Sequence, residues 1–130
     1  MRQEMPLFTK TFDFLTWLLP MTNHFPKAHR HTYTQRLLNA AFDLREHIEA
    51  ANYGMGAKRL ALLKLADQDL DRVRLYVRLA VKWSWFTPNQ YQQAAAMTTE
   101  IGKLLGSWIK LTQNQGPPSK APLSARDASK

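Results

Sequence analysis

Basic side chains with the spacing of one helical face are the residues of this sequence best placed to do chemistry. Arg74, Arg78 and Lys82 follow one another at intervals of four, so a helix would place them on one stripe. Neither arginine has an acidic residue three or four positions after it, and Arg72 adds a further cation. Arginine recognises phosphate and carboxylate well because its planar fork donates paired hydrogen bonds. The stripe therefore predicts binding of an anionic partner.

Two plainer interpretations of this stripe remain open. The first is a solvated helix face, whose cations near the carboxyl end of the helix are stabilised by the helix dipole. The second is pairing of one arginine with a carboxylate of another helix or subunit, with Asp13 and Glu100 as possible partners. Neither interpretation requires a ligand.

A second group of cations lies where the second predicted helix begins. It consists of Lys27 and Arg30, in the stretch K-A-H-R-H at residues 27–31, and of Arg36. Cations are unfavourable at the amino end of a helix, so this placement also points to a ligand. The histidines of the stretch would add positive charge below about pH 6.5.

Other polar residues do not form a catalytic or metal-binding pattern. His29 and His31 are two positions apart, whereas a helical metal pair needs a separation of three or four. We expect His47 to form a surface pair with Asp43, and Asp67 to be a buried carboxylate with a structural role. The sequence has no phosphate-binding glycine loop and no serine nucleophile motif. We therefore expect no enzymatic activity, no cofactor and no bound metal.

Composition favours one basic domain that meets an anionic partner. The chain has 130 residues, 45% of them hydrophobic, with 18 basic and 10 acidic side chains. The net charge of +8 indicates nucleic acid first, and an acidic protein or lipid surface second. The absence of cysteine excludes disulfides and thiolate metal sites. No apolar run is long enough for a membrane span, and the first residues lack the order of a signal peptide, so we expect a cytoplasmic protein.

Hydrophobic periodicity predicts four helices, at residues 7–19, 27–52, 57–86 and 89–112. Proline and glycine separate them, and Thr87-Pro88 supplies a cap for the last one. No alternating strand pattern occurs, and the connections are short. We therefore expect an all-α, up-down antiparallel four-helix bundle over residues 1–112, followed by a flexible, basic, Pro- and Ser-rich tail at 113–130.

Two glycines in the fourth predicted helix need a physical reason. Gly102 and Gly106 lie four residues apart, beside Leu105 and Trp108, in the stretch E-I-G-K-L-L-G-S-W-I-K at 100–110. Each glycine costs about 1 kcal/mol relative to alanine inside a helix. Close approach of another backbone would explain them, either a neighbouring helix of the same chain or a second subunit or bound partner. These four residues are our candidates for helix or oligomer packing.

Aromatic side chains crowd the end of the third predicted helix. Trp83, Trp85 and Phe86 could be core residues at the end of the bundle, or platforms on which nucleobases stack. We favour the core.

The sequence resembles the accessory variability determinant (Avd) proteins of diversity-generating retroelements. The likeness is carried by F-D-F-L-T-W-L-L-P at 12–20, F-P-K-A-H-R at 25–30, L-D-R-V-R-L-Y-V-R-L-A at 70–80, and the stretch at 100–110. These stretches span nearly the whole predicted bundle, and the last is the most specific. Ser107 departs from the pattern, where a second small residue, often glycine, is expected.

The resemblance implies a fold and a function. Members of that family are four-helix bundles assembled as a basic pentameric barrel. They bind the reverse transcriptase of the same retroelement and its template-repeat RNA, and they support mutagenic cDNA synthesis without catalytic activity of their own. DNA is a further candidate partner of this chain. Basic residues of the barrel surface support partner binding, and the matching positions here are Arg74, Arg78, Lys27 and Arg30.

Two alternatives remain. The first is a four-helix protein of the type encoded in intervening sequences of bacterial 23S rRNA genes, acting as an RNA-binding or interaction module. The second is a small bundle enzyme or metal carrier.

Overall fold

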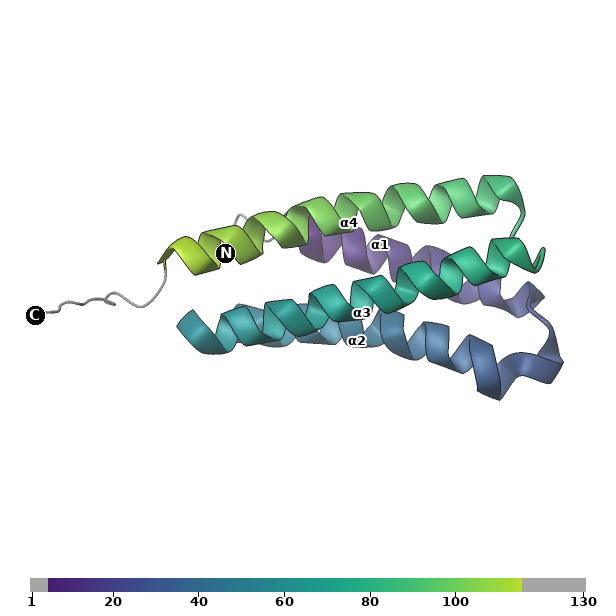
Figure 1. Ribbon diagram of the computed structural model, residues 1–130, viewed down its shortest axis with the longest axis horizontal. Coiled ribbons are helices and arrows are strands. Elements are labelled where there is room, and N and C mark those ends of the chain that lie inside the picture. The colour runs from purple at the N-terminus through teal and green to yellow at the C-terminus, as the bar shows by residue number, and fades with distance from the viewer. Residues whose placement is uncertain (1–4, 116–130) are drawn as a thin grey trace, which may run out of the picture.

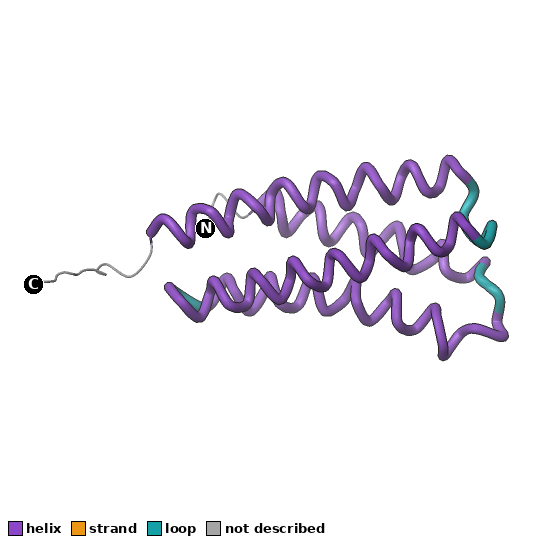
Figure 2. Tube along the Cα trace, viewed as in Figure 1, coloured by secondary structure: helices purple, strands orange, loops and turns teal. Residues whose placement is uncertain are grey.

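Four helices form one antiparallel bundle in the computed structural model, which describes residues 5–115 (Figure 1). They are α1 (Met5–Met21), α2 (Gln35–Tyr53), α3 (Gly56–Lys82) and α4 (Pro88–Gln115). Short helical turns join α1 to α2: η2 (Thr22–His24), η3 (Lys27–His29) and η4 (Arg30–Thr34). Residues 5–115 contain no strand, and loops occupy only brief stretches between helices (Figure 2). The predicted all-α four-helix bundle is confirmed.

The connection between α1 and α2 differs from the sequence prediction. We expected one helix from residue 27, but Lys27–His29 form a 3-10 turn and Arg30–Thr34 a π-helical turn. A π turn accommodates an extra residue and often lies at functional sites. It turns Tyr33 and Thr34 into the protein, whereas Lys27, Arg30 and Arg36 stay exposed.

The turn between α3 and α4 also begins earlier than predicted. The helix ends at Lys82 and not at Phe86, because Ser84 adopts a left-handed conformation with φ of 64°. The N–H groups of Trp85 and Phe86 both donate to the carbonyl of Ala80, at 2.8 and 3.1 Å. These bonds satisfy the carbonyl that the terminated helix leaves open.

Residue Thr87 caps α4 as the sequence predicts. Its hydroxyl accepts a hydrogen bond from the N–H of Gln90 (3.1 Å), and the Gln90 side chain accepts one from the N–H of Thr87 (2.8 Å). This reciprocal pair is a capping box. At its other end α4 continues to Gln115, so Gln113–Gln115, which we assigned to the tail, are helical. Residues 116–130, the rest of the predicted tail, lie outside the described residues.

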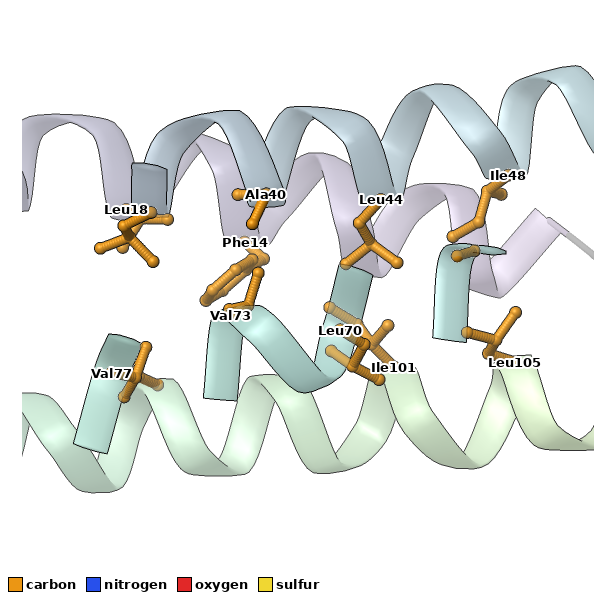
Figure 3. Packing of buried hydrophobic residues seen from close by; sticks show 14 of the residues in the cluster. Phe14, Leu18, Ala40, Leu44, Ile48, Leu70, Val73, Val77, Ile101 and Leu105 are labelled. Atoms are coloured by element: carbon orange, nitrogen blue, oxygen red, sulfur yellow. The ribbon is translucent and has the colours of Figure 1, made fainter. Parts of the chain in front are cut away.

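Apolar side chains from all four helices meet along the axis of the bundle (Figure 3). On α3 the buried apolar positions alternate in steps of three and four residues, the spacing of a heptad. They are Leu63, Ala66, Leu70, Val73, Val77 and Ala80. Phe14 and Leu18 of α1 face Val73, Val77 and the residues of α2 across this core. The packing fixes which side chains of α3 remain free to act outside the bundle.

Candidate nucleic-acid interface

Both the α1–α2 and the α3–α4 connections lie at one end of the bundle, and the α2–α3 connection lies at the other (Figure 1). The half of the bundle with two connections consists of residues 14–42 and 72–99, and contains no Asp or Glu. We call it the acid-free half. Its cations are the seven predicted partner-binding residues, Lys27, Arg30, Arg36, Arg72, Arg74, Arg78 and Lys82.

The rest of the described chain has a different charge balance. Residues 5–13, 43–71 and 100–115 hold seven cations and eight carboxylates. The surplus positive charge of the bundle therefore lies in the acid-free half. Such a one-sided distribution raises the local potential for an anionic partner more than the same charge spread evenly would.

Contacts divide these seven cations into two groups. Arg74 is partly buried: it pairs with Asp71 through Nη1 (3.3 Å) and donates from Nη2 to the carbonyl of Thr98 on α4 (3.3 Å). The partner is thus neither Asp13 nor Glu100, and it lies three residues before the arginine. On the same helix, the sequence-based expectation concerns only positions that follow Arg74, and for this reason it does not predict the pairing with Asp71.

A buried carboxylate holds Arg72. Asp69 is 2% exposed, accepts a hydrogen bond from Arg72 Nη2 (2.6 Å), and lies 2.5 Å from Nδ1 of His47. The prediction that Asp67 is buried was wrong, because the heptad spacing buries Ala66 and places Asp67 outside. His47 likewise pairs with Asp69, and not with Asp43. Arg72 therefore has a structural role at the edge of the acid-free half.

The other five cations are free within the described part of the chain. Lys27, Arg30, Arg36, Arg78 and Lys82 are all exposed, and none forms an ion pair with a residue of 5–115. Exposed cations without a carboxylate partner keep their full charge available for phosphate oxygens.

Hollows in the surface coincide with these cations. One of about 450 Å³, between the end of α1 and the start of α2, is lined by Lys27 and Arg30. A shallower one of about 160 Å³, between α3 and α4, is lined by Arg74 and Arg78. A third, of about 520 Å³, includes Arg36. An anion could therefore approach several of these cations at concave places.

The glycine face of α4 is not explained by backbone contact within the bundle. A Cβ atom at Gly102 would lie 2.5 Å from Nη2 of Arg74, so a guanidinium occupies the space where we expected a backbone. A Cβ atom at Gly106 would meet nothing within 4 Å. Leu105 and Trp108 belong to the core, and Phe8 of α1 packs edge-on against Trp108 at 6.3 Å.

No group of three or more His, Asp or Glu side chains within 5–115 is arranged to hold a metal ion.

Burial raises the pKa of Tyr33, whose hydroxyl donates to the carbonyl of Tyr76. None of the described helices is both long and apolar enough to cross a membrane.

The protein is a small all-α four-helix bundle whose surplus positive charge lies in one half. A protein-family model described as bAvd-like matches residues 5–112, and the chain belongs to this family. The resemblance to Avd proteins is thereby confirmed.

Solved structures with a similar fold include one from a bacterium. It is a protein of unknown function from the S23 ribosomal protein family, from Bacteroides thetaiotaomicron VPI-5482. The TM-score is 0.75 at 19% sequence identity, and the match covers 83% of this chain and 98% of that chain. At this identity the likeness shows the fold alone. No curated protein matches the chain.

Proposed function

We propose that this chain is a non-catalytic accessory protein of a diversity-generating retroelement. It binds the reverse transcriptase of the same element and its template RNA, and it supports mutagenic cDNA synthesis. Membership of the bAvd-like family supports the retroelement context. The observation that carries RNA binding is the acid-free half, where five exposed cations have no carboxylate partner among the described residues.

Binding to RNA should be mainly electrostatic. Each phosphate contact releases counterions, so the affinity falls steeply as the salt concentration rises. Arginine and lysine on an exposed surface contact phosphates without reading sequence. The isolated protein should therefore bind unrelated RNAs with similar affinity.

Charge-matched variants test this proposal. The first replaces Lys27, Arg30, Arg78 and Lys82 by Gln, and the control replaces Lys58, Lys64, Lys103 and Lys110 by Gln. All eight side chains are exposed, and both variants lose the same charge. We expect the first to bind RNA at least about tenfold more weakly, a loss of about 1.4 kcal/mol, and the control to change little. Equal losses would show that only net charge matters and would contradict the assignment of the interface.

The proposal requires a reverse transcriptase encoded by the same retroelement, and copurification with that enzyme tests the protein partner. We expect the wild-type protein and the control variant to bring down the enzyme, and the first variant to do so less. The proposed function requires both interactions. It would be overturned if the wild-type protein did not bind the enzyme, and equally if it did not bind RNA.

We further propose a homo-oligomer, a ring of five subunits as the family resemblance implies. Exposed apolar residues on α1 support subunit contacts, because Phe12 is 63% exposed and Leu19, seven residues on, is 48% exposed. Light scattering should give a mass near five times 15.0 kDa. A monomer at micromolar concentration would contradict the proposal.

The second candidate function is an RNA-binding module of the rRNA intervening-sequence type. The fold it shares with a member of the S23 ribosomal protein family favours this alternative. The gene neighbourhood distinguishes these two candidate functions. Only the retroelement accessory function requires a reverse transcriptase gene and an imperfect repeat pair nearby.

A further inference from the structure

An open hollow of about 520 Å³ lies at the connection end of the bundle, between the start of α2 and the end of α3. Aromatic rings form most of its wall, and one cation lies among them. The side chains that matter are His29, Tyr33, Arg36, Tyr76, Trp83 and Trp85.

Two unusual backbone segments build this hollow. The π turn of η4 directs Tyr33 inward, where its hydroxyl bonds to the Tyr76 carbonyl. On the opposite side Ser84 takes the left-handed conformation, which is costly for a residue other than glycine. Ser84 separates Trp83 from Trp85, and the two indole rings lie 4.9 Å apart at 53°. The local backbone thus gathers aromatic rings that a continuous helix would spread over its surface.

These rings are not equally buried. Phe86 is in the core at 2% exposed, as we expected of all three aromatic residues of this turn. Trp85 is half-buried and contacts Tyr33 edge-on at 5.0 Å, with His29 stacked on it at 5.4 Å and 22°. Trp83, by contrast, is 47% exposed. The expectation of a closed aromatic core therefore fails at Trp83, which presents a large flat ring to solvent at the edge of the hollow.

The charge around the hollow restricts the ligand. Arg36 lines it, Lys82 precedes Trp83 in sequence, and no acidic residue occurs anywhere in the acid-free half. An apolar peptide segment would gain nothing from these cations. A nucleotide offers both complementary features, because its base has a flat face that stacks on aromatic rings and its phosphate is an anion.

We propose that this hollow binds one unpaired nucleobase of a single-stranded nucleic acid. The base stacks on Trp83, and Arg36 holds a neighbouring phosphate. This inference rests on the proposed function and adds to it a preference for single strands over duplexes, which an exposed cationic surface alone would not produce. Base stacking on an aromatic side chain accepts any base, so sequence discrimination stays weak.

Paired substitutions at Trp83 provide the test. The full-length protein is titrated with a labelled single-stranded RNA of about 12 nucleotides, within the usual range of binding-site sizes, and with the duplex of the same sequence. We expect Trp83→Leu to weaken binding of the single strand at least about fivefold, which is the lower end of stacking energies, and to leave duplex binding unchanged. Trp83→Phe retains a ring and should bind the single strand nearly as tightly as the wild-type protein. Tyr53→Leu removes an exposed ring from the other half and serves as the control.

Salt dependence separates stacking from charge. The slope of affinity against salt should be the same for Trp83→Leu and the wild-type protein, whereas Arg36→Gln should reduce it, since one phosphate contact is lost. A free mononucleotide should compete only weakly, because it lacks the neighbouring phosphates of a strand.

Four outcomes would overturn the inference. If Trp83→Leu binds the single strand as the wild-type protein does, or loses strand and duplex equally, the hollow does not hold a base, and the proposed function still stands. If Trp83→Leu weakens binding of the reverse transcriptase but not of RNA, the hollow binds the enzyme and not a nucleobase. If the wild-type protein binds neither strand nor duplex at low salt, RNA binding itself fails, and the inference fails with it.

Discussion

Arg74 of α3 occupies the space above Gly102 of α4. Its Nη2 atom donates to the carbonyl of Thr98, one turn before the glycine, at 3.3 Å. A Cβ atom on Gly102 would lie only 2.5 Å from the same nitrogen. The glycine therefore makes room for a guanidinium that joins two helices, and the most specific stretch of the family resemblance is linked to the cationic stripe.

This relationship predicts coupling between the two residues. Alanine at Gly102 should gain about 1 kcal/mol of helix propensity but displace Arg74 from Thr98, at a cost of about 1 kcal/mol. The net change in unfolding free energy should therefore be near zero. In an Arg74→Ala background the space is empty, and Gly102→Ala should stabilise the protein by about 1 kcal/mol. Chemical denaturation of the four proteins in this cycle measures the coupling.

Arg78→Ala provides the control background, since no atom of Arg78 is among the close neighbours of Gly102. The effect of Gly102→Ala should be the same there as in the wild-type protein. If Gly102→Ala changes the unfolding free energy equally in the Arg74→Ala and Arg78→Ala backgrounds, Gly102 does not serve to accommodate the guanidinium of Arg74.

Stability should also distinguish Arg72 from Arg78. Arg72→Ala leaves the buried carboxylate of Asp69 with His47 as its remaining side-chain partner. We expect this variant to lose about 1–2 kcal/mol of unfolding free energy, because hydrogen bonds to buried charged groups are strong but Arg72 itself is half-exposed. Arg78→Ala removes an exposed side chain without an ion pair in residues 5–115, and should cost less than about 0.5 kcal/mol. If urea denaturation gave the same unfolding free energy for Arg72→Ala and Arg78→Ala, the distinction between a structural Arg72 and a free Arg78 would be contradicted.

Much of the fold could be predicted from the sequence, because heptad spacing and proline or glycine breaks determine where helices begin and pack. The seven cationic candidates could be named from the sequence, because charge is visible without a structure, but their division into paired and unpaired side chains could not. The local details could not be predicted either. Asp69 is buried because it pairs with His47 of α2 and with Arg72, and the contact between the two helices is not visible in the sequence. The left-handed Ser84 has no sequence signal, since glycine is the usual residue in that conformation.

Alkaline pH should destabilise the protein through Tyr33. Burial raises the pKa of this phenol above its ordinary value of 10.0, so the folded state keeps it protonated where the unfolded chain begins to ionise. Its contribution to stability is therefore complete below about pH 10 and declines as the pH rises above it. We expect the thermal midpoint of the wild-type protein to fall more steeply above pH 10 than that of Tyr33→Phe.

Absorbance of tyrosinate gives an independent check of this pH dependence. The protein has four tyrosines. In the native protein the pKa of Tyr33 should lie above its ordinary value of 10.0, because burial favours the neutral phenol. A Tyr33→Phe variant whose native titration loses a group ionising near pH 10 would show that the phenol is accessible, contrary to the structure.

A Cβ atom at Gly106 would meet nothing within 4 Å among the described residues. We therefore expect a close contact with a second subunit to offset the helix propensity that this glycine loses relative to alanine. We expect Gly106→Ala to weaken the proposed oligomer, because a methyl group at an exposed position would separate two subunit surfaces that pack there. Ser107→Ala, at the next exposed position, should leave the oligomer intact. Analytical ultracentrifugation over a range of concentrations measures both dissociation constants. If Gly106→Ala assembles as the wild-type protein does and is also about 1 kcal/mol more stable, the glycine lies on a free surface and only the lost propensity matters.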